Sequence, residues 1–371
     1  MSNASRSFVP LLVLAACTAE QPTSPTLKPN ISRDIAPAAS QTVVMSGLNA
    51  PRGLAWGPEG GLYVVEAGSN IAPGPCVAGG RGASCFSGTG AITRLWHGRQ
   101  ERIASGLPSA YNATTADIGG PADISFVGRG NAQVSINLGG PPAGRAGFGD
   151  GGAAFGTLIA VTPSGNWRVV ADIAAFEAAT HPAGGNFESN PYGILAESDA
   201  RYVTDAGANS LLSVSPNDNV SLVATFAPIP VSPGPFNPPF AQSDPVPTEV
   251  TRGPDGALYV STLTGVPFLP GAAAIYRVVP GHAPQVYIGG LTQVIDFDWG
   301  SDGSAYVVQY AGAPFFGGLG SVIRVAPNGS RSTVAAGLSH PTAVLVGPDG
   351  AIYVSNKGNL PSVGEVLRII P

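Results

Sequence analysis

One short phrase recurs along this chain and limits the folds that it can adopt. The sequence reads GPEGGLYV from Gly57, GPDGALYV from Gly253 and GPDGAIYV from Gly347, with a degraded copy, GSDGSAYV, from Gly300. In the turn Gly-Pro-Asp-Gly, Pro sets φ and Gly accepts a positive φ, and the start of an apolar strand follows. The tyrosines of the last three copies are spaced by 47 residues. A repeat of this length indicates a chain built from copies of one supersecondary unit.

Six such units fit between Gln41 and Pro371, with about 55 residues each, if weaker copies around Val134 and Tyr202 are included. Each unit holds four short strand patterns joined by turns, which predicts an all-β fold, a six-bladed β-propeller with four-stranded blades. One position of the first strand is apolar in every unit and should face the core: Leu54, Ile124, Ile194, Val250, Phe297 and Val344.

The ends of the repeat array suggest how the last blade is completed. The sixth unit ends after three strand patterns, and the segment QTVVMSGL, Gln41 to Leu48, matches the fourth-strand pattern RSTVAAGL of the fifth unit. We therefore expect the N-terminal strand to complete the last blade, which would leave the sheet without an unprotected edge.

Composition argues against one class of partner. Of 371 residues only 11% are charged, and the net charge is −5. A nucleic-acid-binding protein needs a basic surface for the phosphates, so we expect no nucleic-acid partner. A small molecule, a glycan or a protein stays open as the partner, and we expect the chain itself to be a monomer.

The N-terminus has the features of an export signal. Phe8–Ala16 is an apolar run too short to span a bilayer, and it ends in the sequence LAAC at Cys17. LAAC resembles the lipobox of bacterial lipoproteins, which implies cleavage before Cys17 and a lipid on its thiol. A plain signal peptide or a misassigned start codon is the alternative. We predict a signal over residues 1–17, a flexible tether over 18–40 and the propeller over 41–371. The protein would be exported to the periplasm or outer surface, touching membrane only through the lipid.

The two remaining cysteines predict a disulfide. Cys76 and Cys85 enclose a glycine-rich segment, and an exported protein meets an oxidising environment. A metal site is the weaker interpretation, because no His or further Cys is nearby in the sequence.

The long connections all belong to one face of the predicted propeller. Connections after first and third strands are short turns, whereas those after second and fourth strands are long. Function tends to reside on elaborated loops held by a rigid scaffold, so we expect the site on this face. The long connections are Ala67–Gly90, Pro108–Gly120, Leu138–Phe155, a segment with a predicted helix over Ile173–Thr180, Ala227–Val246, Leu263–Ala272 and Ala311–Gly320.

Acidic and amide side chains recur where this face meets the predicted central channel. Some end second strands, and others lie two residues after the Pro that usually opens a first strand. Carboxylate and amide oxygens around a channel are the ligands of Ca²⁺, so one Ca²⁺ is a candidate cofactor. The alternative is that they bind backbone groups or channel water. The candidates are Glu66, Asp123, Asp205, Glu249, Asp296 and Asn356.

Aromatic side chains on the same loops predict either an apolar pocket or simple loop packing. They are Phe148, Phe155, Phe268, Phe315 and Phe316. His340 precedes a first strand on this face and is the one candidate for a catalytic base. The chain shows no recognisable catalytic triad or nucleophile-elbow motif.

Several stretches resemble the ScyD/ScyE family of exported bacterial propellers, named for the scytonemin pigment gene cluster. They include SGLNAPRGLAWGPEGGLYVVEAG, CFSGTGAITRL, ESNPYGILA, YVTDAGANSLLSV, PVPTEVTRGPDGALYVSTLTGVPFLPGAAAIYRV and SHPTAVLVGPDGAIYVSN. The resemblance covers nearly all of Gln41 to Pro371. It implies a six-bladed propeller related to NHL-repeat proteins, but no set of catalytic residues. An accessory role in secondary-metabolite biosynthesis follows from the family name alone.

A more distant likeness is to strictosidine synthase, gluconolactonase and paraoxonase propellers. Those proteins hold a divalent metal at the channel mouth on acid and Asn ligands, and Glu66 matches the place of their first acid. Two function hypotheses result. The first is a lipid-anchored propeller that binds a ligand or protein through its loop-rich face. The second is a metal-dependent hydrolase or lactonase.

Overall fold

The computed structural model of this chain describes residues 40–128, 130–231 and 241–371. The described residues all belong to one compact unit, Ala39–Pro371. The predicted signal segment, Cys17 and residues 18–39 of the predicted tether lie outside the described residues. Across the described ranges, no helix is long and apolar enough to span a bilayer.

Six four-stranded sheets in the described residues share one strand order. Their first strands are β2 (Pro51–Trp56), β10 (Pro121–Phe126), β14 (Pro191–Ala196), β20 (Pro247–Arg252), β24 (Val294–Trp299) and β28 (Ala343–Val346). The second strands are β3 (Leu62–Glu66), β11 (Ala132–Ile136), β15 (Arg201–Asp205), β21 (Leu258–Thr262), β25 (Ala305–Gln309) and β29 (Ile352–Asn356). The third strands are β6 (Gly90–Trp96), β12 (Thr157–Val161), β16 (Ser210–Val214), β22 (Ala273–Val278), β26 (Gly320–Val325) and β30 (Gly364–Ile370). The fourth strands are β7 (Arg99–Leu107), β13 (Trp167–Asp172), β17 (Val220–Thr225), β23 (Gln285–Leu291), β27 (Arg331–Leu338) and β1 (Ser40–Leu48).

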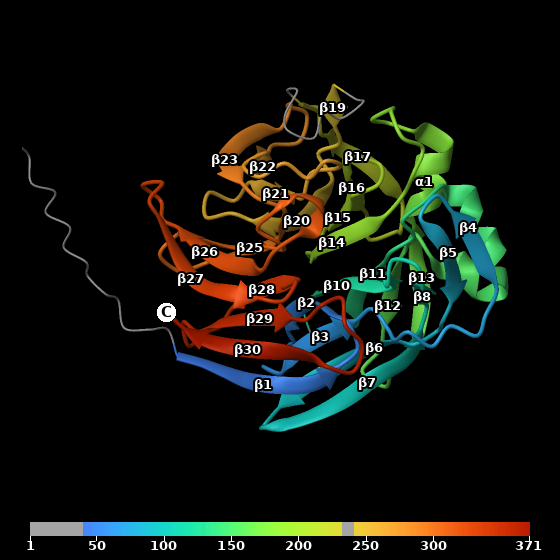
Figure 1. Cartoon of the computed structure of the whole chain (residues 1–371), viewed down its shortest axis with the longest axis horizontal. Coiled ribbons are helices and arrows are strands. Elements are labelled where there is room, and N and C mark those ends of the chain that lie inside the picture. The colour runs from blue at the N-terminus through green and yellow to red at the C-terminus, as the bar shows by residue number, and fades with distance from the viewer. Residues whose placement is uncertain (1–39, 129, 232–240) are drawn as a thin grey trace, which may run out of the picture. The chain divides into compact units, whose positions relative to one another are not determined.

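The first strands of these sheets pack against one another (Figure 1). Contacts run from β2 to β10, β14, β20, β24 and β28 in turn, and β28 also contacts β2. The apolar position predicted to face the core is buried in every one of the six first strands. Apolar clusters fill the spaces between neighbouring sheets, as where Ile124 and Val134 meet Val65 and Ile92. Burial of this surface is what holds each sheet against the next.

The N-terminal strand belongs to the last sheet. β1 pairs antiparallel with β30, with Ser40 opposite Ile370 and Leu48 opposite Gly364. Met45 and Leu48 of β1 are buried in the same apolar cluster as Leu54 of β2. The strand begins at Ser40, the last residue of the tether as predicted from sequence.

The recurring phrase builds a repeated structural clasp. In the copy at Gly253, the backbone N–H of Gly256 donates to the Gly253 carbonyl at 2.9 Å, and Gly256 has a φ of +77°. The ring of Tyr259 covers Gly253 so closely that a Cβ there would overlap it. Asp255 in this turn pairs with Arg277 of the third strand, at 2.6 Å. Equivalent ion pairs are Arg94–Glu59, Arg324–Asp302 and Arg368–Asp349. The phrase therefore recurs because the turn, the ring and the ion pair work together.

The long connections carry a further sheet and the helices. β4 (Cys76–Gly79), β5 (Gly82–Phe86), β8 (Ala110–Asn112) and β9 (Ile118–Gly119) form a four-stranded sheet outside the repeat. The others are α1 (Ile173–Thr180), the 3₁₀ segments η1 (Pro142–Ala154) and η2 (Pro314–Phe316), and the short strands β18 (Ile229–Pro230) and β19 (Gln242–Ser243). The helix predicted over Ile173–Thr180 is confirmed. Asp172 caps it by accepting from the N–H of Ala175 at 2.9 Å.

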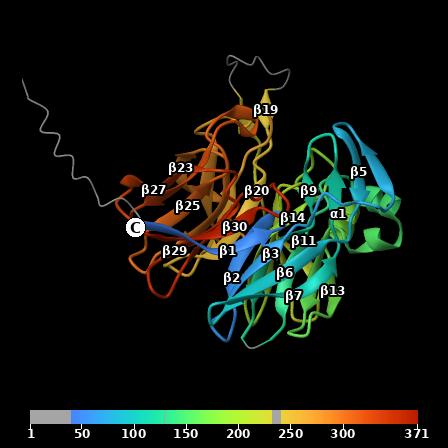
Figure 2. The same ribbon diagram turned by 60° about the horizontal axis from the view of Figure 1, so that its bottom comes forward.

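The predicted disulfide between Cys76 and Cys85 is present and joins β4 to β5. The glycine-rich segment between the two cysteines forms a β-hairpin. Val77 and Phe86 pack with Phe148 and Phe155, so residues from distant parts of the chain give the hairpin its apolar support. Both β4 and β5 contact η1, and both views place β5 near α1 (Figure 1, Figure 2).

Candidate functional site

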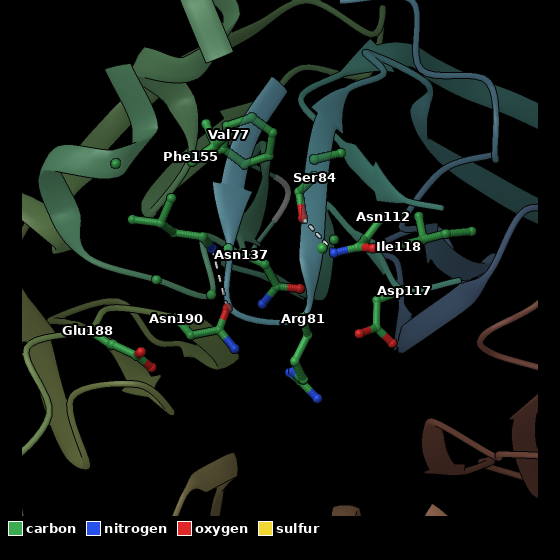
Figure 3. Close-up of a pocket in the computed structure, with 18 of the residues that line it drawn as sticks. Val77, Arg81, Ser84, Asn112, Asp117, Ile118, Asn137, Phe155, Glu188 and Asn190 are labelled. Atoms are coloured by element: carbon green, nitrogen blue, oxygen red, sulfur yellow. Dashed lines mark hydrogen bonds between the residues drawn. The ribbon is translucent and has the colours of Figure 1, made fainter. Parts of the chain in front are cut away.

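A cavity of about 650 Å³ opens among the long connections. Its walls come from the β4–β5–β8–β9 sheet, from residues 137–144, and from the segments that follow β13, β21 and β25. The starts of β2, β14 and β24 also contribute. Figure 3 shows the β4–β5 hairpin on one side, with Val77 and Ser84 on its strands. A cavity of this size suits a small organic molecule.

Three side chains, which we term the donor cluster, are Arg52, Tyr192 and Tyr310; all line this cavity. Nη2 of Arg52 donates to the carbonyl of Ile118 at 3.0 Å. Within the described residues, Nε of Arg52 and the hydroxyl of Tyr192 are buried and have no hydrogen-bond partner. Burial raises the pKa of Tyr192 to about 12, although nearby Arg52 opposes the shift, and burial also raises the pKa of Tyr310. Arg52 and Tyr192 therefore present one N–H and one O–H donor that no group among the described residues accepts.

For two members of the donor cluster, Arg52 and Tyr192, the repeat pattern does not indicate the position because of β-bulges. Strict alternation pointed to the residues two places after the opening Pro, whereas Arg52 and Tyr192 lie one place after it. The register of β2 against β3 shifts between Pro51 and Leu54, and β14 has the same shift against β15. Bulges of this kind re-aim side chains beside functional sites. The sequence does contain a signal for Arg52 and Tyr192, which is that their side chains are large and polar. The equivalent position of the other first strands holds smaller or apolar residues: Ala122, Thr248, Ile295 and Thr342.

The predicted inner acids lie on first strands but do not line the cavity. Oδ2 of Asp123 accepts from the N–H of Ile194 in the next first strand, at 2.8 Å, and Oδ2 of Asp296 accepts from Val344 at 2.8 Å. Oε1 of Glu249 accepts from the N–H of Val250 at 2.9 Å. Two of these acids therefore tie neighbouring sheets together.

Glycines make room for these acids. A Cβ at Gly53 would overlap the Asp123 carboxylate, and one at Gly193 would crowd Glu249. Glycine at these two positions is thus a packing requirement, because Asp123 and Glu249 occupy the space beside them.

The inner acids interact with one another. Burial raises the pKa of Asp123 to about 7. Burial, and then the charges of Asp123 and Asp296, raise the pKa of Glu249 well above its ordinary value. Burial, and then Asp123, raise that of Asp296.

The three candidates at second-strand ends have protein partners of their own. Glu66 is fully buried and pairs with Arg102 at 2.7 Å, while also accepting from Thr93 and the backbone of Asn49. Asp205 accepts from Ser189 at 2.7 Å and from three backbone N–H groups nearby. Asn356 accepts from the Ser339 N–H and donates to Glu365. These side chains hold connections in place through both side-chain and backbone partners.

The structure brings the inner acids near one another but keeps the second-strand acids with separate partners. In the part of the chain that the structure describes, no group of three or more His, Cys, Asp or Glu side chains is arranged to hold a metal ion. His340 does not line the cavity, but its ring packs on that of Tyr310, with centroids 4.9 Å apart.

The predicted aromatic residues divide into two groups. Phe148, Phe155 and Phe316 line the cavity, and the rings of Phe148 and Phe155 have centroids 4.9 Å apart. Phe268 and Phe315 lie outside the lining, and Phe268 stacks on Phe316 with centroids 4.2 Å apart. Both interpretations of these phenylalanines, pocket wall and loop packing, thus apply to different members.

Exposed charges surround the mouth of the cavity. Arg81, at the turn of the β4–β5 hairpin, Asp117 and Glu188 are exposed and line it. Their side chains point toward the open centre of the close-up (Figure 3). None of these three, nor Arg52, forms an ion pair within residues 40–128, 130–231 and 241–371. No sequence pattern singles out any of these charged residues.

Comparison with known proteins supports a propeller-type fold. No protein-family model matches the chain, and no curated protein does either. A candidate glucose dehydrogenase from Thermus thermophilus superposes with a TM-score of 0.52 at 17% identity, covering 90% of this chain and 100% of that one. A candidate gluconolactonase gives 0.51 at 11%, covering 89% and 91%. Virginiamycin B lyase from Staphylococcus aureus gives 0.50 at 12%, covering 90% and 99%. At these identities the likeness concerns the fold alone. The ScyD/ScyE resemblance stays a prediction.

Proposed function

We propose that this protein is a binding module whose cavity among the long connections takes a small molecule. The observation that carries the proposal is the donor cluster. Nε of Arg52 and the hydroxyl of Tyr192 are buried at the cavity without a partner among the described residues. A buried donor without an acceptor costs about 1–3 kcal/mol, so a ligand that supplies the acceptors gains that free energy on binding.

A thermal-shift screen of a small-molecule library against the full chain tests this function. The matched variants are Arg52→Gln, in the cavity, and Arg99→Gln, an exposed arginine of β7 that does not line it. We expect ligands that raise the melting temperature of the wild type and of Arg99→Gln, but raise that of Arg52→Gln much less. A set of ligands whose effect is the same in all three proteins would contradict binding in this cavity.

We further propose that the six repeated sheets are the blades of one six-bladed propeller, closed by β1. Two observations support this: first strands contact one another in sequence with β28 returning to β2, and β1 pairs with β30. Such closure would leave the cavity on a rigid scaffold, since every blade is held by two neighbours.

A divalent-metal hydrolase is the second candidate. Its support is the mutual proximity of Asp123, Glu249 and Asp296, whose repulsion a bound cation would relieve. The test is metal content together with melting at increasing Ca²⁺, in wild type and Asp296→Ala. A Ca²⁺-dependent rise that the variant loses would favour this candidate. Melting that ignores Ca²⁺ in both proteins would remove it.

Export and lipid anchoring through Cys17 are also part of the proposal. They rest on the LAAC sequence alone, which lies outside the described residues. Metabolic labelling with a fatty acid in a bacterial host is the measurement, and Cys17→Ser is the variant. Label on the wild type and none on Cys17→Ser would support the anchor, whereas an unlabelled wild type in the membrane-free fraction would contradict it.

A further inference from the structure

We propose that the ligand of this cavity is an amphiphilic organic anion, with its carboxylate on Arg52 and Tyr192 and an apolar ring against Phe148 and Phe155. This inference rests on the small-molecule binding proposed above and names the class of molecule.

The donor cluster selects an acceptor. A guanidinium has only donors, and the Ile118 carbonyl already takes one of them from Arg52. Nε of the same guanidinium and the Tyr192 hydroxyl are buried and unpartnered within the described residues. A carboxylate accepts from both and forms charge-assisted bonds with Arg, which are about twice as strong as neutral ones. A neutral amide oxygen would gain less, because it carries no charge.

The charges around the cavity are arranged by depth. Arg81, Asp117 and Glu188 are exposed, where water screens their fields. Arg52 is only partly exposed and has no ion pair among the described residues. Asp123 and Asp296 are close enough to influence Tyr192, but each already accepts a backbone N–H, from Ile194 and Val344. The cationic group that a buried anion would meet is therefore Arg52.

The rest of the lining suits an apolar body. Phe148 and Phe155 are buried side chains of the cavity wall, 6% and 2% exposed. Leu138, Leu263 and Ile295 also line it. An aromatic ring would pack against the tilted pair of phenylalanines, which favours offset and edge contacts. A molecule with one charged end and one ring matches this division of the lining.

Three matched compounds test the class by titration calorimetry with the full chain: 3-phenylpropionate, its neutral amide, and propionate, which lacks the ring. We expect the wild type to bind 3-phenylpropionate at least about ten-fold more tightly than either of the others. In Arg52→Gln the preference for carboxylate over amide should disappear, and in Arg99→Gln it should persist. Tyr192→Phe removes one hydroxyl with little change of shape, so it serves if Arg52→Gln does not fold.

The calorimetric results either support or overturn the anionic class of ligand. Equal affinity for acid and amide in the wild type, or a preference that survives in both Arg52→Gln and Tyr192→Phe, would overturn the anionic class. The anionic class would also be overturned if none of the three compounds bound to the wild type. These results do not decide whether the cavity binds a ligand at all, because the library screen tests that. Neutral ligands whose effect on melting is reduced in Arg52→Gln would support the proposed function and contradict this inference.

Discussion

At the scale of single residues, the acids of the first strands are structural groups that titrate in an unusual range. Asp123 and Asp296 accept backbone N–H groups across neighbouring sheets, and burial raises the pKa of both. Burial of this kind favours the protonated form of a carboxyl. The stability of the protein should therefore depend on pH.

We expect the melting temperature to fall as pH rises from about 5 to about 8. The folded-state pKa of Asp123, about 7, lies above the ordinary value, and those of Glu249 and Asp296 are also raised. The folded state thus binds these protons more tightly than the unfolded state. The resulting stability is full below the unfolded pKa, near 4, and is lost as pH rises through the folded pKa. Calorimetric melting at several pH values is the measurement.

Asp123→Asn should make this pH dependence shallower, because the amide keeps an acceptor for Ile194 and does not ionise. At about pH 8 the variant should melt higher than the wild type, by several degrees, since each kcal/mol is worth roughly 1–2 °C in a unit of this size. Asp302→Asn is the control: Arg324 lowers the pKa of Asp302 to about 2, so its contribution changes only in acid. A wild-type melting temperature that is constant over this range would contradict the raised pKa values of these acids.

At the scale of elements, the β4–β5 hairpin is the part of the cavity wall that depends most on a covalent bond. It stands outside the repeated sheets, supported by η1 and by β8. The Cys76–Cys85 disulfide joins its two strands. Closing a loop of this length stabilises the ordered form by about 2–3 kcal/mol in the chain-entropy model. Reduction should loosen the hairpin while the repeated sheets stay folded.

Trypsin offers a direct readout of this loosening, because Arg81 lies exposed at the hairpin turn. We expect cleavage after Arg81 to become several-fold faster in Cys76→Ser/Cys85→Ser than in the wild type. Cleavage after Arg99 on β7 should keep its rate and acts as the internal control. An unchanged rate at Arg81 would show that packing alone holds the hairpin.

At the scale of the whole molecule, the two ends of the described chain meet in one sheet. β1 buries Met45 and Leu48 and covers the edge of β30. Without β1, the last sheet would present an unpaired edge and lose apolar contacts with β2. We therefore expect folding of the C-terminal part to depend on a segment more than 300 residues earlier in the sequence, because Ser40 pairs with Ile370.

Two truncations separate this dependence from any effect of the preceding segment. Removal of residues 1–39 should leave the melting temperature of the remaining unit unchanged, because the described sheets do not include them. Removal of residues 1–48 deletes β1 and should abolish cooperative melting or cause aggregation. Circular dichroism and size-exclusion chromatography measure both. Cooperative melting of the shorter protein at the wild-type temperature would disprove the role of β1.

The sequence by itself determined the repeated architecture. The GPDG turns, the buried apolar position of each first strand and the match of Gln41–Leu48 to a fourth strand are local patterns. Local patterns are readable because a turn needs particular φ values and a strand alternates its faces. The disulfide and α1 could be predicted for the same reason, since their determinants are close in sequence.

The tertiary structure decided the site. Arg52 and Tyr192 reach the cavity because bulges shift the alternation by one residue, and a bulge depends on the pairing partner as well as on the strand itself. Glu66 forms an ion pair with Arg102, and Asp205 accepts from nearby backbone N–H groups. These acids have the spacing of metal ligands, but their oxygens already have partners within the protein. The cavity wall joins the β4–β5 hairpin to η1, which no local pattern indicates. Which groups stay unpartnered depends on the whole fold, because most buried donors and acceptors are satisfied by whatever neighbours the fold gives them.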